Sequence, residues 1–219
     1  MVISLGGIFF EDAARIKQIA AALDELAETH TLYVVTGGGA KAREDIQTAR
    51  ALGANEARCD YIGIAVTRIH AQLLIAALHT AYPEPLADYK EAAVIAKERI
   101  AVMGGVSPGY TTDAVAAILA EYVHADRLIV VTSVDGVYDM DPRRHPDAKK
   151  YDRLTAKELV ALTAKEELKA GSRIVIDPVA AKIIERSRIT TIVIDGSTSQ
   201  NMLDAAHGKQ HGGTEITPG

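Results

Sequence analysis

The sequence has almost no cysteine, no long apolar run and no excess of basic residues. Cys59 is the single cysteine among 219 residues, so neither an intrachain disulfide nor a cysteine-based zinc site can form. A formal net charge of −5 argues against a broad basic surface for nucleic acid. No apolar run reaches membrane-spanning length, and no signal peptide is expected from the first residues. We therefore expect a cytoplasmic protein that contacts neither nucleic acid nor membrane.

Two motifs that are common in nucleotide-binding proteins are absent as well. The chain has neither the GxxxxGK[ST] loop nor a GxGxxG fingerprint after a strand. It does have glycine-rich turns at 6–7, 37–39 and 104–109, each after a short apolar run. Backbone N–H groups in such turns can approach an anion closely, most often a phosphate. The alternative is that these are only tight strand-to-helix connections.

Apolar runs alternate along the chain with amphipathic segments. The runs predict buried strands at 2–5, 31–36, 100–103, 127–132 and 190–194, with an edge strand near 214–216. Such strands separated by helices indicate an α/β fold with a mostly parallel sheet covered on both faces. The glycine turns and the turn after Thr132 would then share the carboxyl edge of the sheet, where these folds bind ligands.

The longest predicted helix begins near Asp60 and ends near Pro83, because proline cannot continue it. Its apolar residues recur at steps of three and four and predict one apolar face: Ile62, Val66, Ile69, Leu73 and Ala76. Asp60 is either the N-cap of this helix or an acceptor for ribose hydroxyls. Later helices are predicted to begin at Thr111 or Thr112, at Thr155, running to about Lys165, and at Asp177.

Charged residues beside the glycine turns have both a functional and a structural interpretation. Arg43 could bind a phosphate, or it could pair with Glu44 or Asp45 on the helix surface. Asp113 could orient catalytic groups or help to hold a metal. It could also be a first-turn carboxylate that the helix dipole favours.

A tight hairpin turn is predicted at Asp135-Gly136. Together with Tyr138 and Asp141, this hairpin could hold an adenine and its ribose. The alternative is a surface hairpin with no ligand.

Six segments, spread nearly end to end, form a specific pattern: Ser4–Gly7, Val35–Gly39, Cys59–Ile64, Met103–Ala117, Thr132–Tyr138 and Ile176–Lys182. On these segments the chain resembles the amino-acid kinase family, and within it the archaeal type of uridylate (UMP) kinase. The GGxxPGxTTD and VDGVY segments are the most specific. The resemblance implies a three-layer αβα fold and transfer of the γ-phosphoryl group of ATP to UMP. It also implies Mg²⁺ and a homohexamer.

The resemblance further implies which residues contact each substrate. Those for ATP would be Ser4, Leu5, Gly6, Gly7, Ile8, Gly39, Arg43, Thr132, Ser133, Tyr138 and Asp141. Those for UMP would be Gly38, Asp60, Val106, Ser107, Pro108, Gly109, Tyr110, Thr111 and Thr112. Arg43 and Asp113 would be catalytic, and no residue is assigned to a metal. We expect one domain over 1–219, with its acceptor-binding part at about 1–125 and its ATP-binding part at about 126–219.

Two positions depart from the wider family. Ser4 stands where bacterial relatives have a lysine, which archaeal members already lack, and Ile8 stands where many members have a serine. Phosphoryl transfer depends on positioning and charge neutralisation, so the charge must come from elsewhere. The candidates are Mg²⁺, Arg43, Lys41, Arg173 and the dipole of the helix after Gly7.

These departures leave two alternatives open. One is a nucleotide-binding storage or regulatory protein that keeps the fold without turnover. The other is a kinase for another small acceptor. An amino-acid acceptor would need a cation facing its carboxylate, and the 106–112 loop offers none.

Overall fold

The computed structural model describes residues 1–140, 142, 145–164 and 175–219. Three predictions lie outside the described residues. They are the contact of Asp141 with ATP, the candidate cation Arg173, and the helix end near Lys165.

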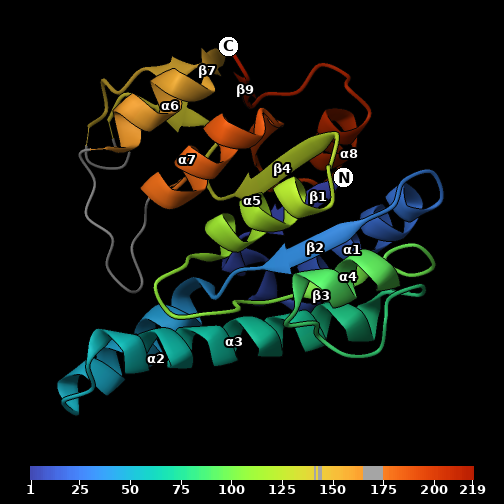
Figure 1. Cartoon of the computed structure of the whole chain (residues 1–219), viewed down its shortest axis with the longest axis vertical. Coiled ribbons are helices and arrows are strands. Elements are labelled where there is room, and N and C mark those ends of the chain that lie inside the picture. Colours follow the sequence, from blue (N-terminus) through green and yellow to red (C-terminus); the bar gives the residue numbers. More distant parts are fainter. Residues whose placement is uncertain (141, 143–144, 165–174) are drawn as a thin grey trace.

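Seven strands of the described residues form one sheet in the order β3-β2-β1-β4-β8-β9-β7. Their bounds are β1 Val2–Leu5, β2 Tyr33–Thr36, β3 Ala101–Met103, β4 Arg127–Thr132, β7 Arg153–Thr155, β8 Thr190–Asp195 and β9 Thr214–Thr217. The first five strands in this order are parallel, whereas β9 is antiparallel to β8 and parallel to β7. The predicted mostly parallel sheet is confirmed (Figure 1). However, β9 lies between β8 and β7, so the prediction of an edge strand is wrong.

Helices cover both faces of this sheet (Figure 1). Their bounds are η1 Gly7–Phe10, α1 Ala13–Ala27, α2 Gly39–Ala51, α3 Glu56–Ala77, α4 Tyr89–Ile95, α5 Thr112–Tyr122, α6 Ala156–Thr163, α7 Pro178–Ser187 and α8 Ser199–Ala206. One hydrophobic core contains buried residues of α4, α5, α6 and α7, and a second contains those of α1, α3 and α8. The expected three-layer αβα architecture is therefore confirmed.

Successive residues of the central strands supply the two cores in turn. Val2 and Val35 belong to the core beside α5, whereas Ile3 and Val34 belong to the core beside α1. This alternation follows from the two-residue period of a strand. Because both faces are covered, every residue of β1 and β2 is buried. Functional groups are therefore left to the ends of these strands.

Predicted helix starts are confirmed at three positions. Thr111 caps α5, and Thr155 caps α6 in a capping box with Glu158. Asp177 caps α7 directly before Pro178. Each cap satisfies backbone N–H groups that have no partner inside the helix.

Helix α3 differs from its prediction in two ways. Its N-cap is Asn55, so Asp60 lies in the second turn and is not a cap. The predicted apolar face is partly wrong, because Ile69 is 55% exposed and Leu73 is 43% exposed. The buried face instead contains polar and small residues such as Thr67 and His70. The physical reason is that the glycine loops approach the helix on that side.

The predicted hairpin turn at Asp135-Gly136 is also wrong. The residues at 135–136 do not join paired strands, because β5 (Val137–Tyr138) pairs antiparallel with β6 (Lys150–Tyr151). Directly after Gly6 the chain forms only the short 3₁₀ turn η1, and α1 begins later, with Asp12 as its N-cap. The helix that follows Gly7 in the chain is therefore separated from that glycine by η1.

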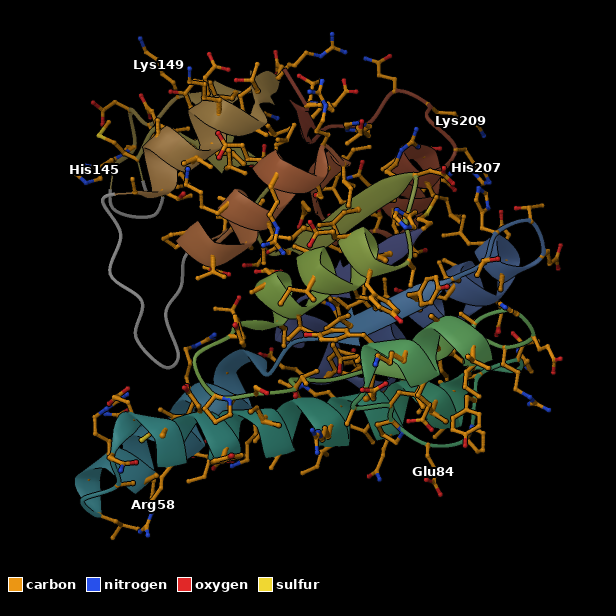
Figure 2. The ribbon with its side chains drawn as sticks, in the orientation of Figure 1. Arg58, Glu84, His145, Lys149, His207 and Lys209 are labelled. Atoms are coloured by element: carbon orange, nitrogen blue, oxygen red, sulfur yellow. The ribbon has the colours of Figure 1, made fainter. Side chains whose placement is uncertain are left out.

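Several charged side chains and the imidazole ring of His145 lie on the outside of the molecule (Figure 2). Figure 2 shows Arg58, Glu84, His145 and Lys149 pointing away from the ribbon. Among the described residues, no group of three or more His, Cys, Asp and Glu side chains could hold a metal ion. In the same part of the chain, no helix is long and apolar enough to cross a bilayer.

Candidate active site

A cavity of about 610 Å³ lies at the carboxyl ends of the central strands. The connections after β1, β2, β3 and β4 all contribute to its lining, through Gly6-Gly7, Gly37–Gly39, Gly105 with Gly109–Asp113, and Thr132–Val134. The carboxyl edge of a parallel sheet is where such folds bind their ligands. The volume falls within the range of small-molecule sites. The expectation that four strand ends face one cleft is met.

The first two glycine turns pack directly against each other. A Cβ atom on Gly7 would lie 2.0 Å from the backbone nitrogen of Gly39, and Gly39 has a φ of +61°. The Gly37 N–H also donates to the Leu5 carbonyl at 2.7 Å. A side chain at Gly7 or Gly39 would therefore force the two loops apart. Glycine is required here for close approach and for backbone conformation.

Positive charge at the cavity comes from Arg43. Among the described residues, it is the one Lys or Arg side chain in the lining. Arg43 extends from the first turns of α2, whose N-terminus is formed by Gly39. The other local candidate, Lys41, binds Asp45 at 2.5 Å and lies near Glu44 at 3.8 Å, away from the lining. Of these two cations, only Arg43 can meet an anion in the cavity.

The Asp113 carboxyl is paired with the Ser4 hydroxyl. The Ser4 hydroxyl donates to Asp113 Oδ1 at 2.8 Å. Burial raises the pKa of the Asp113 carboxyl to about 7, the charge of Asp177 also raises it, and the hydrogen bond from Ser4 lowers it. The neighbouring Thr111 hydroxyl donates to Asp177. This hydrogen bond joins the N-termini of α5 and α7 in the lining of the cavity, which Asp113 also lines.

Asp60 connects α3 to the loop before α5. Its Oδ2 atom accepts the Gly109 N–H at 2.8 Å. Gly109 has a φ of +84°, a conformation that suits glycine. Both residues line the cavity. A carboxylate has capacity for several hydrogen bonds, so this contact leaves room for a ligand hydroxyl.

Most of the residues predicted for the site line this one cavity. They are Ser4, Gly6, Gly7, Ile8, Gly38, Gly39, Arg43, Asp60, Gly109, Tyr110, Thr111, Thr112, Asp113, Thr132 and Ser133. Leu5, Val106, Ser107, Pro108 and Tyr138 are not in the lining. Leu5 is fully buried in the core beside α1. The Tyr138 hydroxyl donates to Asp135 at 2.6 Å.

Four further polar residues line the cavity without having been predicted as site residues: Glu11, Glu56, Thr67 and Asp177. Asp177 was recognised only as a helix cap and as part of the segment Ile176–Lys182, and neither observation assigned it to the site. Thr67 lies on the buried face of α3, and no local sequence pattern indicates which loop packs against that face. Glu11 and Glu56 carry no sequence signal of this kind.

Comparisons with known proteins find a matching family model and similar sequences. The sequence model of the amino acid kinase family matches residues 1–195. A uridylate kinase of Methanococcoides burtonii is 55% identical over 209 residues, covering 93% of this chain and 89% of the relative. One from Methanothrix thermoacetophila is 50% identical, covering 99% and 98%.

Solved structures give the same result. The crystal structure of uridylate kinase from Archaeoglobus fulgidus has a TM-score of 0.90 and 46% identity, covering 99% of both chains. The UMP kinase structure from Ureaplasma parvum has a TM-score of 0.79 at 24% identity, covering 99% of this chain and 97% of that one. At that identity the second likeness concerns the fold alone.

Proposed function

The chain belongs to the amino acid kinase family, and on that premise we propose that it is a UMP kinase. It transfers the γ-phosphoryl group of ATP to UMP, and the products are ADP and UDP. The observation that carries this proposal is the single cavity into which the two packed glycine loops, Asp60 and the Gly109–Asp113 segment all converge. Relatives named uridylate kinase, about half identical over nearly the whole chain, support the choice of acceptor.

The residues of the cavity divide by their chemistry. The backbone of Gly6-Gly7 and Gly38-Gly39 surrounds the phosphates, and Arg43 neutralises charge that develops in the transition state. Asp60 accepts hydrogen bonds from the ribose of UMP. The Thr112 hydroxyl faces the UMP phosphate beside Thr111, whose own hydroxyl donates to Asp177, and the hydroxyls of Thr132 and Ser133 face ATP. No covalent intermediate is needed, because a phosphate oxygen of UMP forms the new bond to the γ-phosphorus while the bond from that phosphorus to the bridging oxygen breaks and ADP leaves.

Magnesium fits the oxygen-rich end of this cavity. Asp113, Ser4 and Ser133 present carboxyl and hydroxyl oxygens in the lining, the ligand type that Mg²⁺ prefers. The described residues offer no cluster of three His, Cys, Asp or Glu side chains. The ion would therefore be held mainly through the substrate phosphates, with few protein ligands. When bound, it supplies neutralisation of phosphate charge.

The proposal also covers which parts of the chain bind each substrate, where in the cell the protein is located, and how it self-associates. We place acceptor binding mainly in residues 1–125 and ATP binding mainly in residues 126–219, within one domain. A cytoplasmic location agrees with the single, buried cysteine. Self-association, with a homohexamer as the expected form, is supported by an exposed apolar stripe on α3.

The decisive experiment is Mg²⁺- and ATP-dependent ADP release against UMP, CMP, dTMP, AMP, GMP and simple amino acids. Strong turnover with UMP supports the proposal. Tight ATP binding without ADP release for any acceptor would contradict it, and would favour the non-catalytic nucleotide-binding alternative. Turnover with an amino acid in place of UMP would contradict the acceptor.

A further inference from the structure

His70 is a buried histidine that does not line the cavity. It lies on the inner face of α3 and is 6% exposed. Its Nδ1 atom is 2.7 Å from the carbonyl oxygen of Gly37. A carbonyl can only accept, so Nδ1 carries the hydrogen and donates it. The ring therefore holds the first residue of the second glycine loop.

The same ring contacts the segment that follows the first glycine loop. Phe10 stacks on His70 with a centroid distance of 4.6 Å and an interplanar angle of 12°. Phe10 is the last residue of η1, which begins at Gly7. One side chain of α3 thus contacts the second loop by a hydrogen bond, and the 3₁₀ turn that continues the first loop by a stacked ring.

Neighbouring side chains of α3 hold the third loop in the same manner. Thr67 Oγ1 accepts the Gly105 N–H at 2.7 Å, and Arg68 Nε donates to the Gly105 carbonyl at 3.3 Å. Helix α3 therefore binds loop backbone at His70 and again about one turn before it, at Thr67 and Arg68. These contacts explain why the buried face of α3 carries polar side chains, and why it is not the apolar face that the sequence predicted.

We propose that His70 is a positioning residue for phosphoryl transfer. It holds the Gly6-Gly7 and Gly37–Gly39 loops at the separation that in-line transfer requires, without touching a substrate. This inference rests on the proposed function, because it assigns the two loops to the phosphates of the reactants. Small misplacements of groups that surround a reacting phosphate cost large factors in rate. The loss is therefore expected in kcat more than in KM.

Two variants separate the two contacts of His70. His70→Phe keeps a ring for Phe10 and removes the donor to Gly37. His70→Asn keeps an N–H close to the position of Nδ1 and removes the ring. We expect His70→Phe to lower kcat by about tenfold or more, with each KM changed less than about threefold. His70→Asn should recover most of that loss, because the hydrogen bond to Gly37 returns.

Leu74→Ala is the matched control. Leu74 lies one turn further along α3, is fully buried in the core beside α1, and does not line the cavity. Its truncation should destabilise the protein, because a cavity is left in the core, without moving the loops. We expect kcat per folded enzyme to stay near the wild-type value. A kcat loss in Leu74→Ala as large as that in His70→Phe would overturn the inference, because general destabilisation would then explain both.

A second measurement does not depend on turnover. Hydrogen–deuterium exchange of the ligand-free protein should rise in His70→Phe for peptides that contain Gly6–Phe10 and Gly37–Gly39. The same peptides should be protected as in wild type in Leu74→Ala. Unchanged exchange and unchanged kcat in His70→Phe would overturn the inference, and so would equal losses of kcat in the Phe and Asn variants. If wild type fails to phosphorylate UMP, the proposed function fails, and exchange alone decides the role of His70.

Discussion

Positive charge is scarce inside the cavity, and this makes single side chains decisive there. With Ser4 at the end of β1, the Asp113 carboxyl has a hydroxyl as its neighbour. Arg43 is the one Lys or Arg in the described lining. Its guanidinium can bind a phosphate through two parallel hydrogen bonds. The transition state of phosphoryl transfer carries its charge on the oxygens that such a group would meet.

Removal of the Arg43 side chain should therefore act on the chemical step. We expect Arg43→Ala to lower kcat for UMP phosphorylation by about tenfold or more. Lys41→Ala is the matched control, since Lys41 extends from the same turn of α2 and pairs with Asp45 away from the lining. Its kcat should stay within about twofold of wild type. Steady-state kinetics with both substrates varied checks this, and an unchanged kcat in Arg43→Ala contradicts the role.

Asp60 should act on acceptor binding. We expect Asp60→Ala to raise KM for UMP by about tenfold or more, because a charged acceptor of ribose hydrogen bonds is lost. The KM for ATP should change less than about threefold. Asp45→Ala on the surface of α2 serves as a control that removes a carboxylate outside the lining. Equal effects of Asp60→Ala on both substrates would argue that its bond to Gly109 organises the whole site.

The titration of Asp113 should be visible in stability. Its pKa is 3.8 when unperturbed and about 7 in the folded protein, chiefly through burial. Between these values the folded protein keeps a proton that the unfolded chain has released. The free energy of unfolding should thus fall as pH rises from about 4 to about 7, by at most about 1.4 kcal/mol per unit, and level off above that.

Asp113→Asn cannot titrate and is the test of this assignment. Urea unfolding of the ligand-free proteins between about pH 5 and about pH 8 should show wild type losing stability relative to Asp113→Asn as pH rises to about 7. A constant difference over that interval would mean that Asp113 is already ionised in the folded protein.

At the level of loops and helices, the site depends on how closely backbones approach. The Gly7 and Gly39 positions leave no space for a Cβ atom, and α3 holds the loop backbone through Thr67, Arg68 and His70. The loops are therefore fixed by contacts on two sides. A change in the separation of the loops should lower the rate of transfer between the two nucleotides, and so reduce kcat/KM for both of them.

Gly7→Ala tests this close approach. The added methyl would overlap the Gly39 backbone, so we expect kcat/KM to fall by at least about 100-fold for both substrates. Gly212→Ala is the matched control, because nothing lies within 4 Å of a Cβ atom there. Its activity should equal that of wild type. Activity assays, with circular dichroism to confirm folding, give the result, and a fully active Gly7→Ala would show that the loops can separate without loss.

For the molecule as a whole, the outer face of α3 is the notable surface. The exposed Gln72 lies among five of its exposed residues that recur at helical spacing and are apolar or small: Tyr61, Ala65, Ile69, Leu73 and Ala76. A contiguous exposed apolar stripe on a folded protein is typical of an interaction surface. Since the opposite face of the same helix holds the glycine loops, assembly through this stripe would also stabilise the site.

Self-association can be tested on this stripe. Light scattering should give wild type a mass several times that of the 23.4 kDa chain, and Ile69→Glu with Leu73→Glu should lower it. Leu52→Glu is the control, since Leu52 is 84% exposed at the end of α2 and outside the stripe. A wild-type mass of a single chain would contradict the predicted assembly. An unchanged mass in the double variant would move the interface elsewhere.

Much of this protein follows from local pattern. The buried strands, the glycine turns at their carboxyl ends and the caps at Thr111, Thr155 and Asp177 were all predictable from the sequence. Each depends on neighbouring residues only: the period of apolar side chains, the freedom of glycine, or a side chain that reaches its own helix start. Even the convergence of four loops on one cleft follows once the sheet is known to be parallel.

Other features depend on which distant segments meet. The buried face of α3, the inner position of β9 and the pairing of 137–138 with 150–151 all contradicted the local patterns. The hydrogen bonds of Asp113 with Ser4 and of His70 with Gly37 join residues that are far apart in the chain. No spacing pattern in the sequence could therefore predict them. The sequence by itself determined the αβα layers and the edge that binds ligands, because strand pattern and turn chemistry are local. Only the tertiary structure decided which side chains control that edge, because burial, pKa and loop position arise where separate elements pack together.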